Sequence, residues 1–282
     1  MTDRLVSIVI PCFNDEPEHL ISSVRSAQNQ THPHTEVVVV NDGSTRTETI
    51  AALRQLEGAK VLHQDNRGPG AALNLGIEAA SGQYILPLGA DDTLDDRLVE
   101  LTYRRLVCEG PQVMGVYPRV EFFGLREGTM NAPPSVDFRE LAVRNKVVAT
   151  TLYRKSDWMR AGGYGSFDDC SEDWYFWLIL TGRLGGRLVQ EPEAVFHYRI
   201  RPSSRNLINR GVDRKEACRR HAAAALPPDR VMELYLAAAR EADEAIADAD
   251  RYGSYVASWR HRLRYLLPAY KGARDLKRRL MA

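Results

Sequence analysis

Residues 5–11, Leu-Val-Ser-Ile-Val-Ile-Pro, form an apolar run that is rich in β-branched side chains and ends in proline. Such an uninterrupted run is typical of a strand buried on both faces of a sheet. A second run of this kind, Glu-Val-Val-Val-Val, covers residues 36–40, and the residues between 17 and 27 carry apolar side chains at helical spacing. This stretch therefore predicts a strand, a loop, a helix and a second strand, parallel to the first.

The same alternation continues along the chain. We expect helices over 46–57, 69–80 and 98–108 and strands at 60–62 and 83–88. Further strands are expected at 112–123, 147–153 and 194–200, a helix opening near Glu172, and helix beyond 212, broken at Pro227-Pro228 and near Gly253. Strands alternating with helices predict an α/β fold with a mostly parallel central sheet covered by helices on its faces.

The composition is that of an ordinary globular protein, with 282 residues, 44% hydrophobic, 27% charged and a net charge of +1. A nearly neutral chain has no overall field that would attract nucleic acid, so no nucleic-acid partner is expected. The sequence from Met1 lacks the order of a signal peptide, and no window approaches the ~20 apolar residues of a membrane-spanning helix. We therefore expect a cytoplasmic protein.

The four cysteines, Cys12, Cys108, Cys170 and Cys218, lie far apart in the sequence. Without a Cys-x-x-Cys pair, they argue against a zinc site and against a redox dithiol. We expect four unpaired thiols, buried or idle in a reducing compartment.

Polar pairs directly follow three of the expected strands: Asn14-Asp15, Asn41-Asp42 and Asp91-Asp92. In open α/β sheets, ligands bind at the carboxyl ends of the strands, so these pairs should converge on one edge. The Asp91-Asp92 pair has two interpretations. It could hold a hard divalent cation that bridges a diphosphate, or it could cap the helix expected at 94–107.

Three other segments also have two interpretations each. Asp42 is either part of a turn or an acceptor for a ring imide or sugar hydroxyl. Glu172-Asp173 either complements the dipole of the helix it opens or contains a general base beside an aromatic wall. The arginines at 199, 201 and 205 are either a diphosphate clamp or a solvated stretch, and the neighbouring His197 is either a metal ligand or a packed strand residue.

Taken together, the segments VSIVIPCFND, VVVVNDGST, NRGPGAALNLGIEAASGQYILPLGADD, GGY and SEDWYFW resemble, in this order, the family 2 glycosyltransferases across residues 5–206. The resemblance implies a GT-A fold, Rossmann-like, with a catalytic domain at 1–211 and a C-terminal helical region at 212–282. Nucleotide-sugar binding would occupy about 1–110 and the acceptor side about 111–211. The implied activity is an inverting transfer of sugar from a nucleotide-diphosphate sugar to an acceptor hydroxyl, in synthesis of cell-surface polysaccharide or glycoconjugate.

The resemblance also implies roles for individual residues. The donor-binding positions would be Pro11, Asn14, Asp15, Asp42, Asn66, Gly68, Asn74, Asp92, Arg199, Arg201 and Ser203. Asp173, with Glu172 beside it, would be the catalytic base. Trp174 and Trp177 could stack on an acceptor sugar, whereas their helical spacing favours a core position for one of them. The region 145–154 and the turn Gly162-Gly163-Tyr164 would lie on the acceptor side.

The metal motif departs from the family's pattern. The usual Asp-x-Asp reads Gly89-Ala90-Asp91 here, so Asp91 would be the ligand of a Mn²⁺ or Mg²⁺ cofactor, with one carboxylate fewer than usual. Many relatives have a histidine where this chain has Arg201. The departure leaves open a variant that is nearly independent of metal.

Residues 251–282 contain nine Arg or Lys against the single acid Asp275 and form a basic amphipathic helix by pattern. This segment either packs on the catalytic domain or docks at the inner face of a membrane, which would suit a lipid-linked saccharide acceptor. Two rival functions also stay open: an inactive glycosyltransferase-like binding protein, motivated by Gly89, and a sugar nucleotidyltransferase. The segment after the first strand lacks the basic, glycine-rich loop that a nucleotidyltransferase would have.

Overall fold

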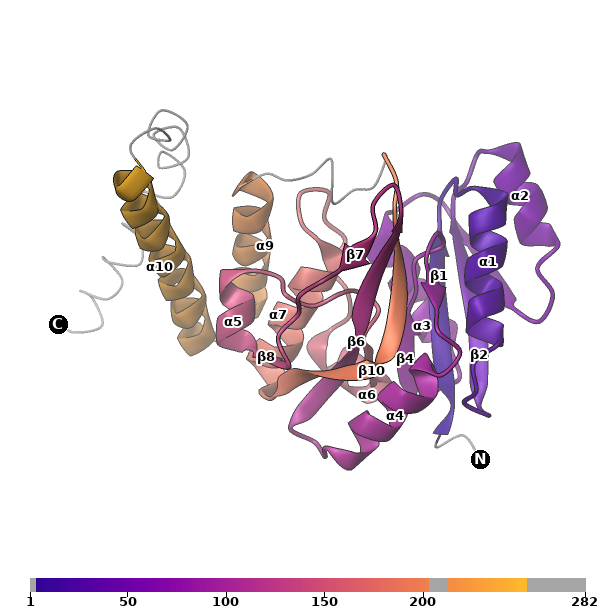
Figure 1. Ribbon diagram of the computed structural model, residues 1–282, viewed down its shortest axis with the longest axis horizontal. Helices are drawn as coiled ribbons and strands as arrows, with labels where there is room; N and C mark the ends of the chain where they lie inside the picture. Colours follow the sequence, from indigo (N-terminus) through magenta and orange to yellow (C-terminus); the bar gives the residue numbers. More distant parts are fainter. Residues whose placement is uncertain (1–3, 203–211, 253–282) are drawn as a thin grey trace.

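The computed structural model describes residues 4–202 and 212–252 (Figure 1). Its strands are β1 Val6–Cys12, β2 Thr35–Asp42, β3 Lys60–Gln64, β4 Tyr84–Pro87, β5 Thr93–Leu94, β6 Val113–Gly124, β7 Gly128–Thr129, β8 Ser135–Asp137, β9 Leu152–Arg154 and β10 Arg187–Ile200. Its helices are α1 Pro17–Gln28, α2 Thr47–Arg54, α3 Pro69–Ala79, α4 Leu98–Cys108, α5 Phe138–Val143, α6 Lys155–Ala161, α7 Glu172–Leu184, α9 Val212–Ala225 and α10 Pro228–Tyr252.

One mixed sheet of ten strands runs through the described molecule in the order β3-β2-β1-β4-β9-β6-β10-β5, with β7 beside β6 and β8 beside β10. The first four strands pair in parallel, as the alternation of strands and helices predicts. The short β9 then runs antiparallel to both of its neighbours, β4 and β6. The parallel part is therefore confined to the N-terminal half and to the β6–β10 pair.

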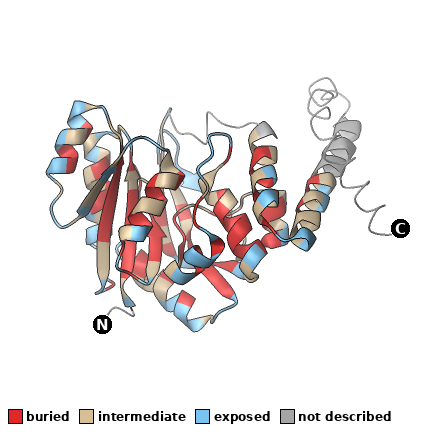
Figure 2. Ribbon diagram, turned by 180° about the vertical axis from the view of Figure 1, so that it is seen from behind, coloured by how far each residue is buried: buried red, intermediate tan, exposed pale blue. Residues whose placement is uncertain are grey.

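The uninterrupted apolar runs of β1 and β2 are explained by helices on both faces of the sheet. Val9 and Val38 pack in the cluster with α3, whereas Ile8 and Ile10 pack in the cluster with α1 and α4. Successive side chains of a strand point to opposite faces, so both sets must be apolar. The buried positions run along the central strands and the helices that cover them (Figure 2).

Helix α3 approaches the sheet through Gly76. A Cβ built there would overlap Val9 Cγ1 and lie 3.0 Å from Val40 Cγ2. We therefore predict that Gly76→Ala lowers the free energy of unfolding by about 1–3 kcal/mol through overpacking. Urea denaturation would measure this loss against Glu78→Ala, a change at an exposed position of the same helix. Equal losses in both variants would contradict the close packing.

Several element boundaries differ from the predicted ones. The last strand begins at Arg187 rather than 194 and continues across a register shift between Glu191 and Val195. The strand expected at 147–153 is reduced to β9, because the residues before it form a turn in which Thr151 Oγ1 donates to the carbonyl of Val148 at 2.8 Å. The sequence pattern also missed α5, which opens with a capping box between Asp137 and Glu140, as well as α6 and the short β5, β7 and β8.

The expectation of four unpaired thiols is wrong for two of the cysteines. Cys170 and Cys218 form a disulfide across 48 residues of sequence, because α9 returns to the N-terminus of α7. Cys12 and Cys108 are free, the first buried and the second exposed. Burial raises the pKa of the Cys12 thiol to about 12, so this thiol stays protonated at neutral pH.

The C-terminal helices lie at the opposite end of the molecule from β2 (Figure 1). Helix α9 packs on α7, and α10 packs on α5. Within the described ranges, no helix is both long and apolar enough to cross a membrane. The predicted membrane-docking segment 251–282 lies almost wholly outside the described residues.

Candidate functional site

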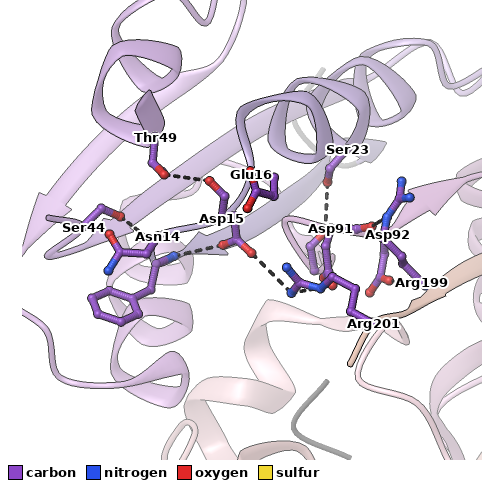
Figure 3. Close-up of polar contacts among 12 residues, drawn as sticks. Asn14, Asp15, Glu16, Ser23, Ser44, Thr49, Asp91, Asp92, Arg199 and Arg201 are labelled. Atoms are coloured by element: carbon purple, nitrogen blue, oxygen red, sulfur yellow. Dashed lines mark hydrogen bonds and ion pairs between the residues drawn. The ribbon is translucent and has the colours of Figure 1, made fainter. Parts of the chain in front are cut away.

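The loops that follow β1 and β2 are joined at the carboxyl end of the sheet by Asn14. Its Oδ1 accepts hydrogen bonds from the backbone N–H groups of Thr45 and Arg46, both at 2.8 Å, and its own N–H donates to Ser44 Oγ at 3.0 Å. Asn14 adopts φ 55°, a left-handed conformation that asparagine tolerates better than most residues. Asn14 therefore fixes the two loops against each other and presents Asp15 toward the next strand end (Figure 3).

Asp42, at the end of β2, holds the loop that leads into α3. Its carboxylate is 3% exposed and accepts from Gln64 Nε2 at 2.6 Å and from the backbone N–H groups of Arg67 and Gly68, both at 2.9 Å. Asn66 is exposed, and its Oδ1 accepts from the Gly68 N–H at 3.3 Å. Asp42 thus shapes the loop in which the predicted donor residues Asn66 and Gly68 lie.

The acidic pair after β4 is held from three sides. Ser23 Oγ of α1 donates to the Gly89 carbonyl at 2.9 Å, the backbone N–H of Arg199 donates to Asp92 Oδ1 at 2.8 Å, and Arg199 Nε donates to the Asp91 carbonyl at 2.8 Å (Figure 3). Asp92 is 4% exposed, and burial, followed by the charge of Asp91, raises the pKa of its carboxyl well above the usual range.

The helix-cap interpretation of Asp91-Asp92 is wrong. Helix α4 begins only at Leu98, its N-cap residue is Arg97, and the strand β5 lies between the acidic pair and the helix. The pair instead belongs to the same edge of the sheet as Asp15 (Figure 3).

Arg201, just beyond β10, brings the carboxylates of two loops together. Its Nη2 lies 2.7 Å from Asp91 Oδ2 and 3.6 Å from Asp15 Oδ1 (Figure 3). Burial raises the pKa of the Asp15 carboxyl and the negative charge of Asp91 adds to this, while the guanidinium of Arg201 acts in the opposite direction. The Arg201 side chain is 27% exposed, more than the side chains of Asp91 and Asp15 at 18% and 14%.

The side-chain amide of Asn74 forms hydrogen bonds that the sequence did not predict. From α3, its Nδ2 donates to the Tyr164 carbonyl at 2.9 Å, while its Oδ1 accepts from the Tyr164 N–H at 2.8 Å and from Trp158 Nε1 at 3.2 Å. The turn Gly162-Gly163-Tyr164 is thereby fastened to α3. The amide therefore fixes the position of the turn that precedes the segment leading to α7.

Glu172 and Asp173 form the first turn of α7, as predicted. Asp173 Oδ2 accepts from Asn145 Nδ2 at 2.9 Å, and its Oδ1 accepts from the Trp174 N–H at 2.7 Å. Glu172 borders a cavity of about 150 Å³ between the loop at 67–70 and the segment before α7, with Arg214 of α9 on its wall. A half-buried carboxylate beside a cavity can accept a proton from a bound hydroxyl.

Trp174 and Trp177 do not offer stacking faces. They are 4% and 0% exposed, and Trp174 Nε1 donates to the Leu141 carbonyl at 2.8 Å within the core. Helix α7 is covered on most of its circumference, so aromatic side chains at helical spacing along it fill the interior. Because both rings are buried, the prediction that they stack on an acceptor sugar is wrong.

The remaining predicted residues are Pro11, His197, Ser203 and Arg205. Pro11 is part of β1, opposite Val40 of β2, and is half-buried beneath the loops. His197 lies on β10 opposite Thr93 of β5, with its Nδ1 3.6 Å from Glu121 Oε2. Ser203 lies outside the described residues, as does Arg205.

Three residues that were not predicted from the sequence also belong to these networks: Asn145, Gln64 and Arg214. Asn145 lies within the segment 145–154 that the resemblance had placed on the acceptor side, whereas Gln64 and Arg214 are common residue types in a strand and a helix. Only their partners in space, Asp42 for Gln64 and the Cys170 carbonyl for Arg214, single them out.

Solved structures support the fold. S. aureus TarS superposes with a TM-score of 0.61 at 18% sequence identity, over 82% of this chain and 42% of that one. A shorter form of TarS, solved in complex with UDP-GlcNAc, gives 0.58 at 19% identity over 84% and 66% of the two chains.

Curated relatives match about a third of the chain. An uncharacterized glycosyltransferase of Rickettsia bellii is 40% identical over 103 residues, which are 36% of this chain and 15% of that protein. Glycosyltransferase GlyG of Streptococcus pneumoniae is 34% identical over 107 residues, 36% of this chain and 35% of GlyG. The matched part is thus about a third or less of these relatives' own length.

The family itself is defined by a longer match. The family model described as glycosyl transferase family 2 matches residues 7–155, just over half of the chain, and this range contains the loops of Asn14, Asp42 and the acidic pair. This chain therefore belongs to glycosyl transferase family 2.

Proposed function

We propose that this protein is an inverting glycosyltransferase that transfers a sugar from a nucleotide-diphosphate sugar to an acceptor hydroxyl, in synthesis of a cell-surface polysaccharide or glycoconjugate. One observation carries the proposal. Carboxylates from the loops after β1 and β4 face an arginine from the end of β10, at the carboxyl edge of the parallel strands where α/β sheets bind ligands (Figure 3). The proposed catalytic domain is 1–211, and the helical region follows from 212.

The donor would lie across this edge. Pro11, Asn14, Asp15 and Asp42 belong to the β1 and β2 ends and would contact the base and ribose, with Asn66 and Gly68 in the loop that Asp42 holds. Arg199 and Arg201 are the cations at this edge that could bind a diphosphate. Because TarS has been solved with UDP-GlcNAc, uridine nucleotides are the first donors to test.

Asp173 is the proposed base, with Glu172 beside it. In the reaction, the acceptor oxygen forms a bond to the anomeric carbon and loses its proton to the Asp173 carboxylate. The bond from that carbon to the diphosphate breaks, and its electron pair leaves with the nucleoside diphosphate. A single displacement of this kind inverts the anomeric configuration. The hydrogen bond from Asn145 supports the role, because it orients the carboxylate.

A Mn²⁺ or Mg²⁺ ion at Asp91 is what the family resemblance predicts, and such an ion would stabilise the leaving diphosphate when bound. The donor set among the described residues does not fit it. No three His, Cys, Asp or Glu residues gather there as a ligand group. The Asp91 carboxylate is paired with Arg201, and Asp92 is buried and accepts from the Arg199 N–H.

A thermal-shift screen with UDP, GDP, CDP and dTDP tests the donor class. A ligand at a hundredfold excess over its Kd stabilises the folded state by about 2.7 kcal/mol, so one nucleotide should raise the melting temperature. Release of nucleoside diphosphate from the matching sugar nucleotide, measured with and without acceptor saccharides, then tests transfer. Stabilisation without any release would support the inactive-binder alternative, and no stabilisation by any nucleotide would contradict the proposal.

Membrane contact through 251–282 and a lipid-linked saccharide acceptor are proposed on the sequence pattern alone. Flotation with anionic liposomes would compare the full chain with a variant in which Arg260, Arg262 and Arg264 are glutamine. We expect the full chain to float and the variant to float less, because the anionic surface attracts the basic face. Equal flotation of the two proteins would contradict the proposal.

A further inference from the structure

Arg201 lies where the family's metal would be held. Its guanidinium contacts the Asp91 carboxylate, the predicted metal ligand, at 2.7 Å and faces the Asp15 carboxylate at 3.6 Å (Figure 3). A guanidinium is charged at every physiological pH and binds phosphate oxygens through two parallel N–H groups. It therefore brings to this position a permanent positive charge and donors that match a diphosphate.

The acidic pair has little capacity left for a divalent cation. At phosphate-binding sites, proteins hold Mg²⁺ through one or two carboxylates, and waters and substrate phosphates complete its octahedron. Asp92 is 4% exposed, and one of its oxygens already accepts from the Arg199 N–H at 2.8 Å. The Asp91 side chain is paired with Arg201, and its carbonyl accepts from Arg199 Nε at 2.8 Å.

Gly89 stands where the family's motif has its first aspartate, and a side chain at this position would meet the Asp92 carboxylate. A Cβ built on Gly89 would lie 2.5 Å from Asp92 Oδ2 and 3.2 Å from Asp91 Oδ1. An aspartate at 89 would therefore require Asp92 to move. The buried position of Asp92 therefore depends on glycine at position 89. As a result, this chain lacks a carboxylate that the family's pattern has.

Both arginines are held in position by neighbouring groups. Arg199 lies over the ring of Phe123, with its Cζ 4.3 Å from the ring centroid, and is anchored to the Asp91 carbonyl. Arg201 is held by Asp91 and Asp15 from two different loops. These contacts keep a cationic group at the strand ends before a donor arrives, which reduces the entropy lost on binding.

We propose that the guanidinium of Arg201 supplies the positive charge that binds the donor diphosphate and stabilises it as a leaving group, so that donor binding by this chain does not require a divalent cation. This inference rests on the proposed function. The bond from the anomeric carbon to the diphosphate oxygen breaks, and the electron pair stays on that oxygen. Arg201 donates hydrogen bonds to the diphosphate and transfers no proton.

The test is binding of nucleoside diphosphates to the full chain, measured by calorimetry in EDTA and in Mn²⁺, with Mn²⁺ binding followed separately by the electron paramagnetic resonance signal of the free ion. Wild type should bind one of UDP, GDP, CDP or dTDP equally well in both conditions. Arg201→Gln should weaken binding in EDTA by about tenfold or more, the effect of losing charge-assisted hydrogen bonds. Arg201→His should also bind weakly in EDTA, because an imidazole is mostly uncharged at neutral pH.

Arg187→Gln is the matched control, because Arg187 starts the same strand at its opposite end and also faces a carboxylate, Glu109, at 3.6 Å. This variant should bind like wild type. Thermal unfolding of each variant shows whether it is folded. Arg201→Lys keeps the positive charge and gives a second measure if the glutamine variant is unstable. Its affinity for the nucleoside diphosphate in EDTA should lie between those of wild type and Arg201→His.

Three results would overturn the inference while the proposed function stands, and two of them concern nucleotide binding: binding by wild type that disappears in EDTA and returns with Mn²⁺, or binding by Arg201→Gln in EDTA that equals wild type. Failure of every nucleoside diphosphate to bind wild type, with or without Mn²⁺, would overturn the proposed function and this inference together. Loss of the free Mn²⁺ signal on adding protein alone would reveal a resident metal site and would also overturn it.

Discussion

Replacing Asp173 with asparagine is expected to slow glycosyl transfer by about 10²- to 10⁴-fold, the usual contribution of a positioned general base. The amide is nearly the same size and can still accept the hydrogen bond from the Trp174 N–H, but it cannot accept the proton of the acceptor hydroxyl. Binding of the nucleoside diphosphate should be unchanged, because Arg199 and Arg201, the residues proposed to bind it, belong to a different part of the site. Initial rates at saturating donor, together with calorimetric binding, measure the two quantities separately.

Two further variants decide whether the loss is specific to this carboxylate. Glu172→Gln changes the neighbouring acid at the same helix end and should reduce the rate less than Asp173→Asn. Asp169→Asn changes a nearby exposed carboxylate that pairs with Arg220 and His221, and it should leave the rate unaltered. If Glu172→Gln abolishes transfer while Asp173→Asn retains the wild-type rate, the base has been assigned to the wrong one of the two residues.

The parallel half of the fold could be predicted because its signals are local. The apolar runs of β1 and β2, and the polar residues that follow them, occur within single stretches of sequence. A parallel sheet covered on both faces leaves few other arrangements for such runs, and it brings their carboxyl ends to one edge. The loops carrying Asn14, Asp15 and Asp42 were therefore expected together before their contacts were known.

The second half could not be predicted in the same detail, because its contacts join residues that are far apart in sequence. The pairing of Arg201 with Asp91 depends on β10 returning beside β5 and the loop before it. The same run of aromatic residues at 174–177 fits either an acceptor platform or a core helix, and the packing of α5, α6 and α9 against α7 selects the core. Asn74 is another case, since its partners belong to a turn 90 residues later.

The disulfide between Cys170 and Cys218 is the largest departure from the sequence expectation, and its reduction is expected to lower the free energy of unfolding by about 2–4 kcal/mol. The bond closes a loop with a sequence separation of 48, so it restricts the unfolded chain strongly. Cys170 directly precedes the N-cap residue of α7, Ser171, so the bond ties α9 to the end of the helix that carries the proposed base.

Reduction should nevertheless leave α9 in place, because other groups hold it. Arg214 Nη2 donates to the Cys170 carbonyl at 3.0 Å, and Arg219, which is 2% exposed, donates to the carbonyls of Ala142 and Val143 at 3.0 and 2.6 Å. We therefore expect the reduced protein to keep its circular dichroism spectrum and to unfold at a lower urea concentration. Cys170→Ser should behave like the reduced protein, and Cys108→Ser, at an exposed free cysteine, like the oxidised one. Equal urea midpoints with and without reductant, in protein whose disulfide is confirmed by mass spectrometry, would show that the α9 contacts alone set the stability of this region.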